Sequence, residues 1–344
     1  MATISFRPVR AFGHHPSGTR ARRSFLETIL SWQDRASDRA HLMDLDDRLL
    51  SDMGIDRAAA RFEAAKPFWR AVGMRIPVYQ VDAFAQGPFT GNPAAVCPLG
   101  AWLDDATMQA IAESNNLSET AFLVRRGQEA GADYDLRWFT PAKEVDLCGH
   151  ATLASGDVVL RVLEPERGSV TFHTRSGPLS VARGGDGLEM NLPAYPPERL
   201  SGEAAAAAVA AVGGEVLEVW QAGKMLAVLP SAAAVRAARP DLLRVAALDA
   251  DGLIVTASAD PQSDGCDFVS RYFVPQGGID EDPVTGSAHS LLAPFWAARL
   301  GKNPLVAQQV SARGGYLTCD LREDRVILRG RVNPFMDGEI AFAR

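Results

Sequence analysis

The chain of 344 residues is long enough for two to three domains, and 47% apolar with 22% charged residues is ordinary for a globular protein. The net charge of −7 is unevenly distributed, because residues 1–73 carry 12 Lys and Arg against 9 Asp and Glu, and the rest carries 23 against 33. An acidic body disfavours nucleic-acid binding there, whereas binding of RNA stays open for residues 19–70. No apolar run is long enough to predict a membrane span.

Residues 1–18 contain Pro, Gly and His and are expected to be disordered. From residue 19 to 73 the apolar spacing predicts a helical appendage of three helices. Their marker residues are Phe25, Ile29 and Trp32 in the first helix, Leu45, Leu49, Leu50 and Met53 in the second, and Asp56 as the cap of the third over residues 57–65.

Residues 45–57 (LDDRLLSDMGIDR) resemble the YjiS-like family of very short, Arg-rich bacterial proteins, whose biochemical role is poorly defined. An amphipathic appendage that packs on the body or on a partner is the alternative interpretation. Because this segment is mildly basic, we also consider that residues 19–70 tune association with RNA or a second subunit and are dispensable for chemistry.

Two regions follow, residues 75–192 and 193–344, and each mixes strands with one apolar helix. In the first region Asp104 is expected to cap a helix that ends near Ser114, with Met108, Ile111 and Ala112 facing inward. The apolar helices run from residue 149 to about 163 and from 286 to 300. A helix that is apolar on nearly every side must be wrapped, so we predict an α+β fold of two lobes, each a curved sheet around a central helix.

The two regions also repeat each other. Residues 137–141 (RWFTP) and 149–151 (GHA) recur as residues 271–275 (RYFVP) and 286–288 (GSA). Two copies at so long a period predict a duplicated lobe with a site in the cleft between the copies. Whether the last strand, near residues 339–343, crosses back to the first lobe is left open.

Both apolar helices begin with Gly-x-Ala. Small residues leave the N–H groups of a helix start open, and the positive end of the helix dipole attracts an anion. Two such ends facing one cleft would bind the carboxylate of a small metabolite. In the alternative interpretation Gly149 and Gly286 are turn residues, and Thr152 and Ser287 are helix caps.

Four further motifs occur in register: residues 91–96 (GNPAAV), 117–122 (LSETAF), 147–152 (LCGHAT) and 281–288 (EDPVTGSA). In this order they resemble the PhzF-like isomerase family of phenazine biosynthesis, over residues 75–344. The resemblance implies a fold like diaminopimelate epimerase, a site between the lobes, no cofactor or metal, and frequent homodimers. It places the family's acid/base carboxylate on Glu119 and supporting roles on His150, Asp282 and Ser287.

The implied reaction moves a proton between carbons of a small carboxylated metabolite. A carboxyl group in a partly desolvated pocket, here Glu119, can remove a proton and return it elsewhere. His150 and Asp282 would hydrogen-bond the substrate or accept a proton. The predicted substrate-binding residues are Asn92, Cys148, Gly149, Gly286 and Ser287.

Each of these residues also has a purely structural interpretation, as a solvated strand entry for Glu119, a turn for Asp282 and a cap for His150. Two other functions stay open. One is an epimerase that uses the Cys148 thiol with Asp282 or Glu119, although matching the repeats places Thr285 opposite Cys148 and disfavours a pair of thiols. The other is a non-catalytic metabolite-binding protein that reports ligand occupancy through the N-terminal helices.

The remaining cysteines, Cys97, Cys266 and Cys319, are far apart and form neither a CxxC pair nor a cluster with histidines that is typical of zinc. Together with Cys148 they are typical of reduced thiols. We therefore expect a cytoplasmic protein without a metal centre.

Overall fold

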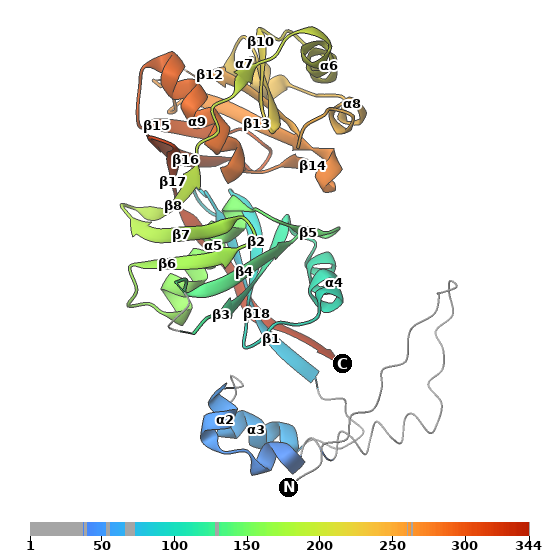
Figure 1. Ribbon diagram of the computed structural model, residues 1–344, viewed down its shortest axis with the longest axis vertical. Helices are drawn as coiled ribbons and strands as arrows, with labels where there is room; N and C mark the ends of the chain where they lie inside the picture. Colours follow the sequence, from blue (N-terminus) through green and yellow to red (C-terminus); the bar gives the residue numbers. More distant parts are fainter. Residues whose placement is uncertain are drawn as a thin grey trace, which may run out of the picture. The chain divides into compact units, whose positions relative to one another are not determined.

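The computed structural model describes residues 37, 40–52, 56–65, 73–127, 131–259, 261, 262 and 264–343 (Figure 1). The segment 1–18, the predicted helix through Phe25, Ile29 and Trp32, and Met53 lie outside these residues. The chain divides into two compact units, Met1–Gly73 with Ala343–Arg344 and Met74–Phe342. No helix in the described part of the chain is long and apolar enough to cross a lipid bilayer.

The first unit contains the short helices α2 (Asp47–Asp52) and α3 (Arg57–Ala64). The Leu49 N–H donates to Asp46 Oδ1 at 2.8 Å, so Asp46 caps α2 and the helix begins at Asp47. The prediction that Leu45 belongs to this helix was therefore wrong. The Leu45 carbonyl instead accepts a hydrogen bond of 2.6 Å from the guanidinium of Arg57, the first residue of α3.

The second unit consists of two lobes. The elements of the first lobe are β1 (Gly73–Ala83), β2 (Asn92–Leu99), α4 (Asp105–Asn115), β3 (Glu119–Arg125), β4 (Tyr134–Phe139), β5 (Glu144–Val145), α5 (Gly149–Val158), the π-helical η1 (Val159–Leu163), β6 (Ser169–Thr174), β7 (Gly177–Gly184) and β8 (Gly187–Pro193).

The elements that follow are β9 (Glu198–Arg199), α6 (Gly202–Val212), β10 (Glu218–Ala222), β11 (Lys224–Val228), α7 (Ala232–Ala237), α8 (Leu242–Ala246), β12 (Leu253–Ser258), β13 (Phe268–Val274), the 3-10 turn η2 (Pro275–Gly277), β14 (Ile279–Asp282), α9 (Gly286–Leu300), β15 (Leu305–Gln309), β16 (Gly315–Arg322), β17 (Arg325–Gly330) and β18 (Val332–Ala343).

Strand pairing is the same in both lobes. The pairs β1–β2, β3–β4, β4–β5, β6–β7 and β7–β8 are antiparallel, and β2–β3 and β4–β6 are parallel. The series from β10 to β17 repeats this order. The lobes join where β8 pairs with β17. Strand β9 pairs with β10 in the second lobe, and the final strand β18 returns to the first lobe, where it pairs with β1.

The central helices are enclosed by these curved sheets because they have no polar face. Every residue of α5 is buried, and α9 is buried from Ala288 to Trp296. Helix α4 covers the outer face of the first sheet and α6, α7 and α8 that of the second. Beyond Val158 the predicted helix continues as η1, so the segment up to residue 163 has two helical geometries.

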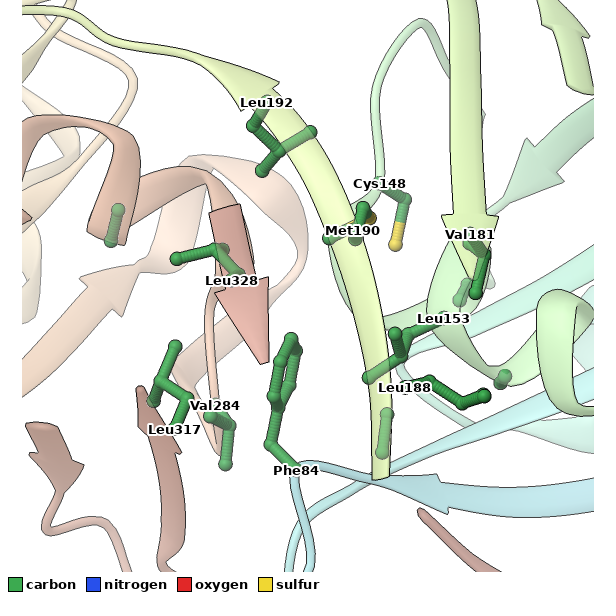
Figure 2. Packing of buried hydrophobic residues seen from close by; sticks show 14 of the residues in the cluster. Phe84, Cys148, Leu153, Val181, Leu188, Met190, Leu192, Val284, Leu317 and Leu328 are labelled. Carbon is green, nitrogen blue, oxygen red and sulfur yellow. The ribbon is translucent and has the colours of Figure 1, made fainter. Parts of the chain in front are cut away.

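The N-termini of α5 and α9 meet at two glycines. A Cβ atom added to Gly149 would lie 3.2 Å from Gly286 Cα, and one added to Gly286 would lie 3.3 Å from Gly149 Cα. The Met190 side chain, which lies beside Cys148 in Figure 2, contacts the same point from β8. Only residues without a side chain allow the two helix starts to approach so closely, and this approach brings both starts to the boundary between the lobes.

Candidate active site

A cavity of about 510 Å³ lies between the lobes of the second unit. Seven of the eight predicted site residues line it, namely Glu119, Cys148, Gly149 and His150 from the first lobe and Asp282, Gly286 and Ser287 from the second. Among the described residues the cavity is also lined by side chains that the sequence analysis did not select, including Lys224 and Tyr272. The duplication therefore brings these predicted residues together around one cavity between the copies.

Both central helices open into this cavity at their N-terminal ends. Neither N-cap residue, Cys148 for α5 or Thr285 for α9, caps its helix through its side chain. The structural alternative does not hold here, since the Thr152 hydroxyl donates to the Cys148 carbonyl and Ser287 lies inside α9. Two positive helix ends thus face one cavity, an arrangement that favours a bound carboxylate.

Glu119 and His150 are neighbouring titratable side chains on the first lobe, His150 buried and Glu119 largely buried. Glu119 begins β3, and His150 is the second residue of α5. Glu119 Oε2 lies 2.9 Å from His150 Nε2, with side-chain exposures of 15% and 4%, but the two atoms form no aligned hydrogen bond. Burial disfavours the charged imidazolium, yet the neighbouring Cys148 and Glu119 favour it more strongly and hold the pKa of His150 well above its usual value.

Asn92 joins this pair to the second lobe from behind the cavity. Its amide nitrogen donates to Asp282 Oδ1 at 2.7 Å and to the Val284 carbonyl at 2.9 Å, and it lies 3.0 Å from His150 Nδ1. Its oxygen accepts from the Ser118 hydroxyl at 2.9 Å. Asn92 is fully buried and does not line the cavity, so the structure does not bring this predicted substrate-binding residue to the cavity surface.

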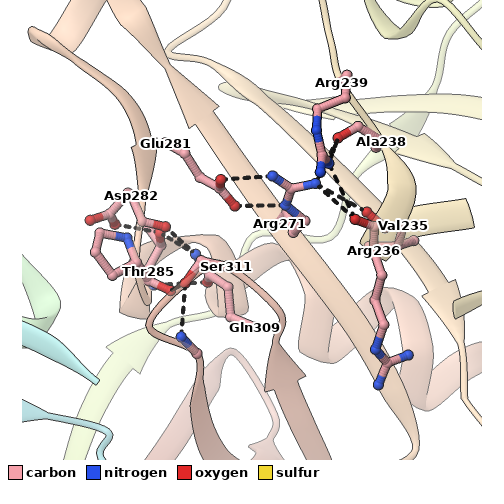
Figure 3. A network of polar contacts seen from close by, with 12 residues as sticks. Val235, Arg236, Ala238, Arg239, Arg271, Glu281, Asp282, Thr285, Gln309 and Ser311 are labelled. Atoms are coloured by element: carbon pink, nitrogen blue, oxygen red, sulfur yellow. Dashed lines mark hydrogen bonds and ion pairs between the residues drawn. The ribbon is translucent and has the colours of Figure 1, made fainter. Parts of the chain in front are cut away.

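Asp282 is a buried carboxylate of the second lobe, at the end of β14. Its Oδ2 accepts from the Thr285 hydroxyl, and Gln309 fixes the same turn (Figure 3). The Gln309 amide donates to the Asp282 carbonyl at 2.7 Å and accepts from Thr285 N at 2.9 Å. Burial raises the pKa of Asp282 to about 6, and the charge of Glu119 adds to this, whereas His150 and the hydrogen bonds oppose it.

Replacing Asp282 with asparagine is expected to remove a pH-dependent cost of folding. A raised folded-state pKa favours the protonated side chain, so its contribution is fully present below 3.8 and is lost as the pH rises through about 6. This shift corresponds to about 3 kcal/mol. Urea unfolding at several pH values should therefore show the wild type losing stability relative to Asp282→Asn between about pH 4 and pH 6. A difference between the two proteins that stays constant over that range would contradict the assignment.

The Cys148 thiol lies beside this network without being activated by it. Its Sγ is 3.5 Å from His150 Nδ1. Burial, assisted by the charge of Glu119, raises the pKa of Cys148 to about 11, so the group is a neutral thiol near pH 7. All four cysteines are free and buried, and Cys148 alone among them lines the cavity. The arrangement provides no opposed pair of thiols.

Glu119, Cys148 and His150 are also a possible metal-ligand group, since one ligand atom from each lies within 4.8 Å of the others. The carboxylate contacts Nε2 and the thiol contacts Nδ1, which are the two nitrogens of one imidazole. Zinc requires all donors within about 2.0–2.3 Å of one point. A metal bound to one ring nitrogen would therefore require the side chain that contacts the other nitrogen to move.

Comparisons with known proteins agree with this geometry. A sequence model described as phenazine biosynthesis-like protein (PhzC-PhzF) matches residues 81–338, and a YjiS-like domain matches residues 25–61. An uncharacterized isomerase of Pseudomonas aeruginosa is 50% identical over 267 residues, which are 78% of this chain and 99% of that protein. The crystal structure of a PhzF-family protein of Enterococcus faecalis is 45% identical, with a TM-score of 0.72 over 78% of this chain and 99% of that one.

A more distant structure, a hydroxyproline epimerase from Agrobacterium vitis, shares the fold alone, at 12% identity and a TM-score of 0.52 over 80% of this chain and 95% of that one. The fold and the relatives define an isomerase with the two-lobed architecture of the epimerases. The chain belongs to the phenazine biosynthesis-like PhzC-PhzF family, and its N-terminal part carries a YjiS-like domain. Both resemblances and the predicted fold class are thereby confirmed.

Proposed function

We propose that this isomerase moves a proton between two carbon atoms of a small carboxylated metabolite, with Glu119 as the group that carries the proton. The observation that supports this most directly is the placement of Glu119 in contact with His150, at a cavity into which two helix N-termini open. A base for a carbon-bound proton needs a carboxylate that substrate can reach and bulk water cannot surround.

In the proposed reaction the Glu119 carboxylate removes a proton from one carbon, and the electron pair delocalises into the adjacent unsaturated or carboxyl system. The same carboxyl group then returns the proton to a different carbon, so the composition of the molecule is unchanged and no cofactor takes part. The Ser287 hydroxyl and the first N–H groups of α5 and α9 would bind the substrate carboxylate and fix which carbon faces Glu119.

An epimerase that uses Cys148 is the second candidate, because the Cys148 thiol lies 3.5 Å from His150. A proton would then be removed on one face of a carbon by the thiolate and replaced on the other by a carboxyl group. The raised pKa of Cys148 disfavours this reaction, since it leaves little thiolate near neutral pH.

Heavy water provides the test. Wild-type protein incubated in it with a panel of small carboxylated metabolites should place deuterium on a carbon of at least one of them and convert it to an isomer, as measured by mass spectrometry and NMR. A folded protein that labels no carboxylated compound, but labels or converts uncharged analogues, would refute the proposed substrate class.

A further inference from the structure

Lys224 is a charged residue of the cavity wall to which the reaction above gives no role. It begins β11 and lies two positions before Leu226, so both side chains point to the same face of the strand. Strand register places Leu226 in a row with Ile254, Tyr272 and Asp282 across the second lobe. Lys224 therefore projects from the inner face of that sheet, the face that carries Asp282.

The Lys224 ammonium is largely buried without a close counter-ion. Its side chain is only 17% exposed, and the nearest carboxylate oxygen in the described part of the chain is Asp251 Oδ2, at 4.0 Å on a side chain that is 75% exposed. Its Nζ lies 5.7 Å from the centre of the Tyr272 ring. Burial lowers the pKa of Lys224, and the charges of Asp251 and Asp282 oppose that shift.

Lys302 of the same lobe is a comparison for Lys224, because it is a lysine with a close ion pair. Its side chain is 50% exposed, yet its Nζ contacts both oxygens of Asp267 at 2.6 and 2.8 Å. Burying a charged group without a partner is costly, and the cost rises as water is excluded. Lys224 is the more deeply buried of the two and the less well paired, which indicates that a ligand completes its interactions.

The repeat shows that Lys224 is specific to one side of the cavity. Phe139 and Phe273 hold the same place in the repeated motif, and strand register extends the match. The matched rows are Phe139, Thr120 and Ala95 in the first lobe and Phe273, Leu253 and Met225 in the second. One residue back along the strands, Lys224 corresponds to Ala94, and Gly252 corresponds to Glu119.

The duplicated lobes therefore differ in charge at matched positions of one cavity. The first lobe contributes the Glu119 carboxylate and the second lobe the Lys224 ammonium. Gly252 makes room for this arrangement, since a Cβ atom there would lie 2.8 Å from both Tyr272 Cε2 and the Tyr272 hydroxyl. The Tyr272 ring occupies that space, and its hydroxyl donates to the Asp251 carbonyl at 2.6 Å.

We infer that Lys224 binds a second carboxylate of the substrate, so that the enzyme acts on a dicarboxylate rather than a monocarboxylate. This inference rests on the proposed function, in which the helix starts bind the first carboxylate and Glu119 faces the carbon between the two ends. A second carboxylate would supply a closer counter-charge than the Asp251 carboxylate at 4.0 Å. It would also fix the substrate at both ends, which is what selects one C–H bond for the carboxyl base.

The test compares dicarboxylates with their monoamides, which have nearly the same shape and one charge less. Malonate, succinate, glutarate and adipate and the four monoamides are titrated calorimetrically into the wild type, Lys224→Met, Lys224→Arg and Lys143→Met. The wild type should bind at least one dicarboxylate about tenfold or more tightly than its monoamide. Lys224→Met should abolish this preference, and Lys224→Arg should retain most of it.

Lys143→Met is the matched control, because Lys143 also lines the cavity but is exposed, and this variant should keep the preference. Equal binding of every pair by the wild type, or an unchanged preference in Lys224→Met, would overturn the inference. Failure of the proposed function has a different signature, since the preference would persist while no carboxylate took up deuterium. Failure of the inference alone would show as deuterium uptake into monocarboxylates at the same rate in the wild type and Lys224→Met.

Discussion

Glu119→Gln is expected to lower turnover roughly 10³-fold or more, because one carboxyl group both removes and returns the proton in the proposed reaction. Glutamine has the same size and can still accept a hydrogen bond, so its contact with His150 Nε2 can persist while the basic oxygen is lost. The measurement is the rate of deuterium uptake into the substrate, wild type beside variant, with thermal unfolding to show that both are folded.

The variant should also change the pKa of His150. This measurement tests whether the Glu119 charge acts on the imidazole, independently of whether Glu119 carries the proton. The Glu119 charge favours the imidazolium, so the pKa of His150 should fall in Glu119→Gln, as NMR of the imidazole protons would show. Cys148→Ser is the matched control for the chemistry and should keep turnover within about tenfold. If Glu119→Gln kept its rate and Cys148→Ser lost it, the thiol epimerase would be the better description.

Local sequence pattern was sufficient to predict much of the fold. Asp104 accepts from Thr107 N at 2.9 Å and caps α4, with Met108 and Ile111 buried as expected. Helix α9 covers residues 286 to 300, as its uniform apolar character indicated. These features depend on contacts within a few residues, which a periodicity argument captures.

Contacts across long sequence distances were not predictable in the same way. The return of β18 to the first lobe depends on which sheet edge is free after folding, and this cannot be read from the residues of β18 alone. Lys224 follows a hairpin glycine and has no signature of its own. Lys224 stands out as a charge specific to the second lobe only when strand register aligns it with Ala94 of the other copy.

The repeated motif contains one further signal, which indicates how the loops before the two central helices are held. Arg137 and Arg271 occupy the same place in the repeated motif, and each forms a two-point ion pair with the short strand that follows, to Glu144 and Glu281. Figure 3 shows the second of these pairs. They stiffen the loops that lead from β4 and β13 to the helix starts, so their duplication marks structural support for the cavity.

Asn92→Ala is expected to be the most damaging change outside the cavity surface. Removal of the amide leaves the buried Asp282 carboxylate and the Val284 carbonyl, both on the second lobe, without a donor from the first. Loss of a partner from a buried charged group costs about 3–5 kcal/mol. The free energy of unfolding should fall by an amount of this order.

His150 should also be less well positioned in this variant. Asn92 lies 3.0 Å from His150 Nδ1 and is itself held by a hydrogen bond from the Ser118 hydroxyl. Substitution of a residue that acts through others should lower kcat more than it raises KM. The part of the loss that arises from misplaced groups should persist at temperatures where the variant is fully folded.

Asn115→Ala is the matched control, since the Asn115 side chain makes a single bond of 3.1 Å to Thr120 and does not reach the other lobe. Urea unfolding and steady-state kinetics of both variants give the comparison. Equal effects of the two substitutions would contradict the assignment of Asn92 as the residue that links Asp282 to His150.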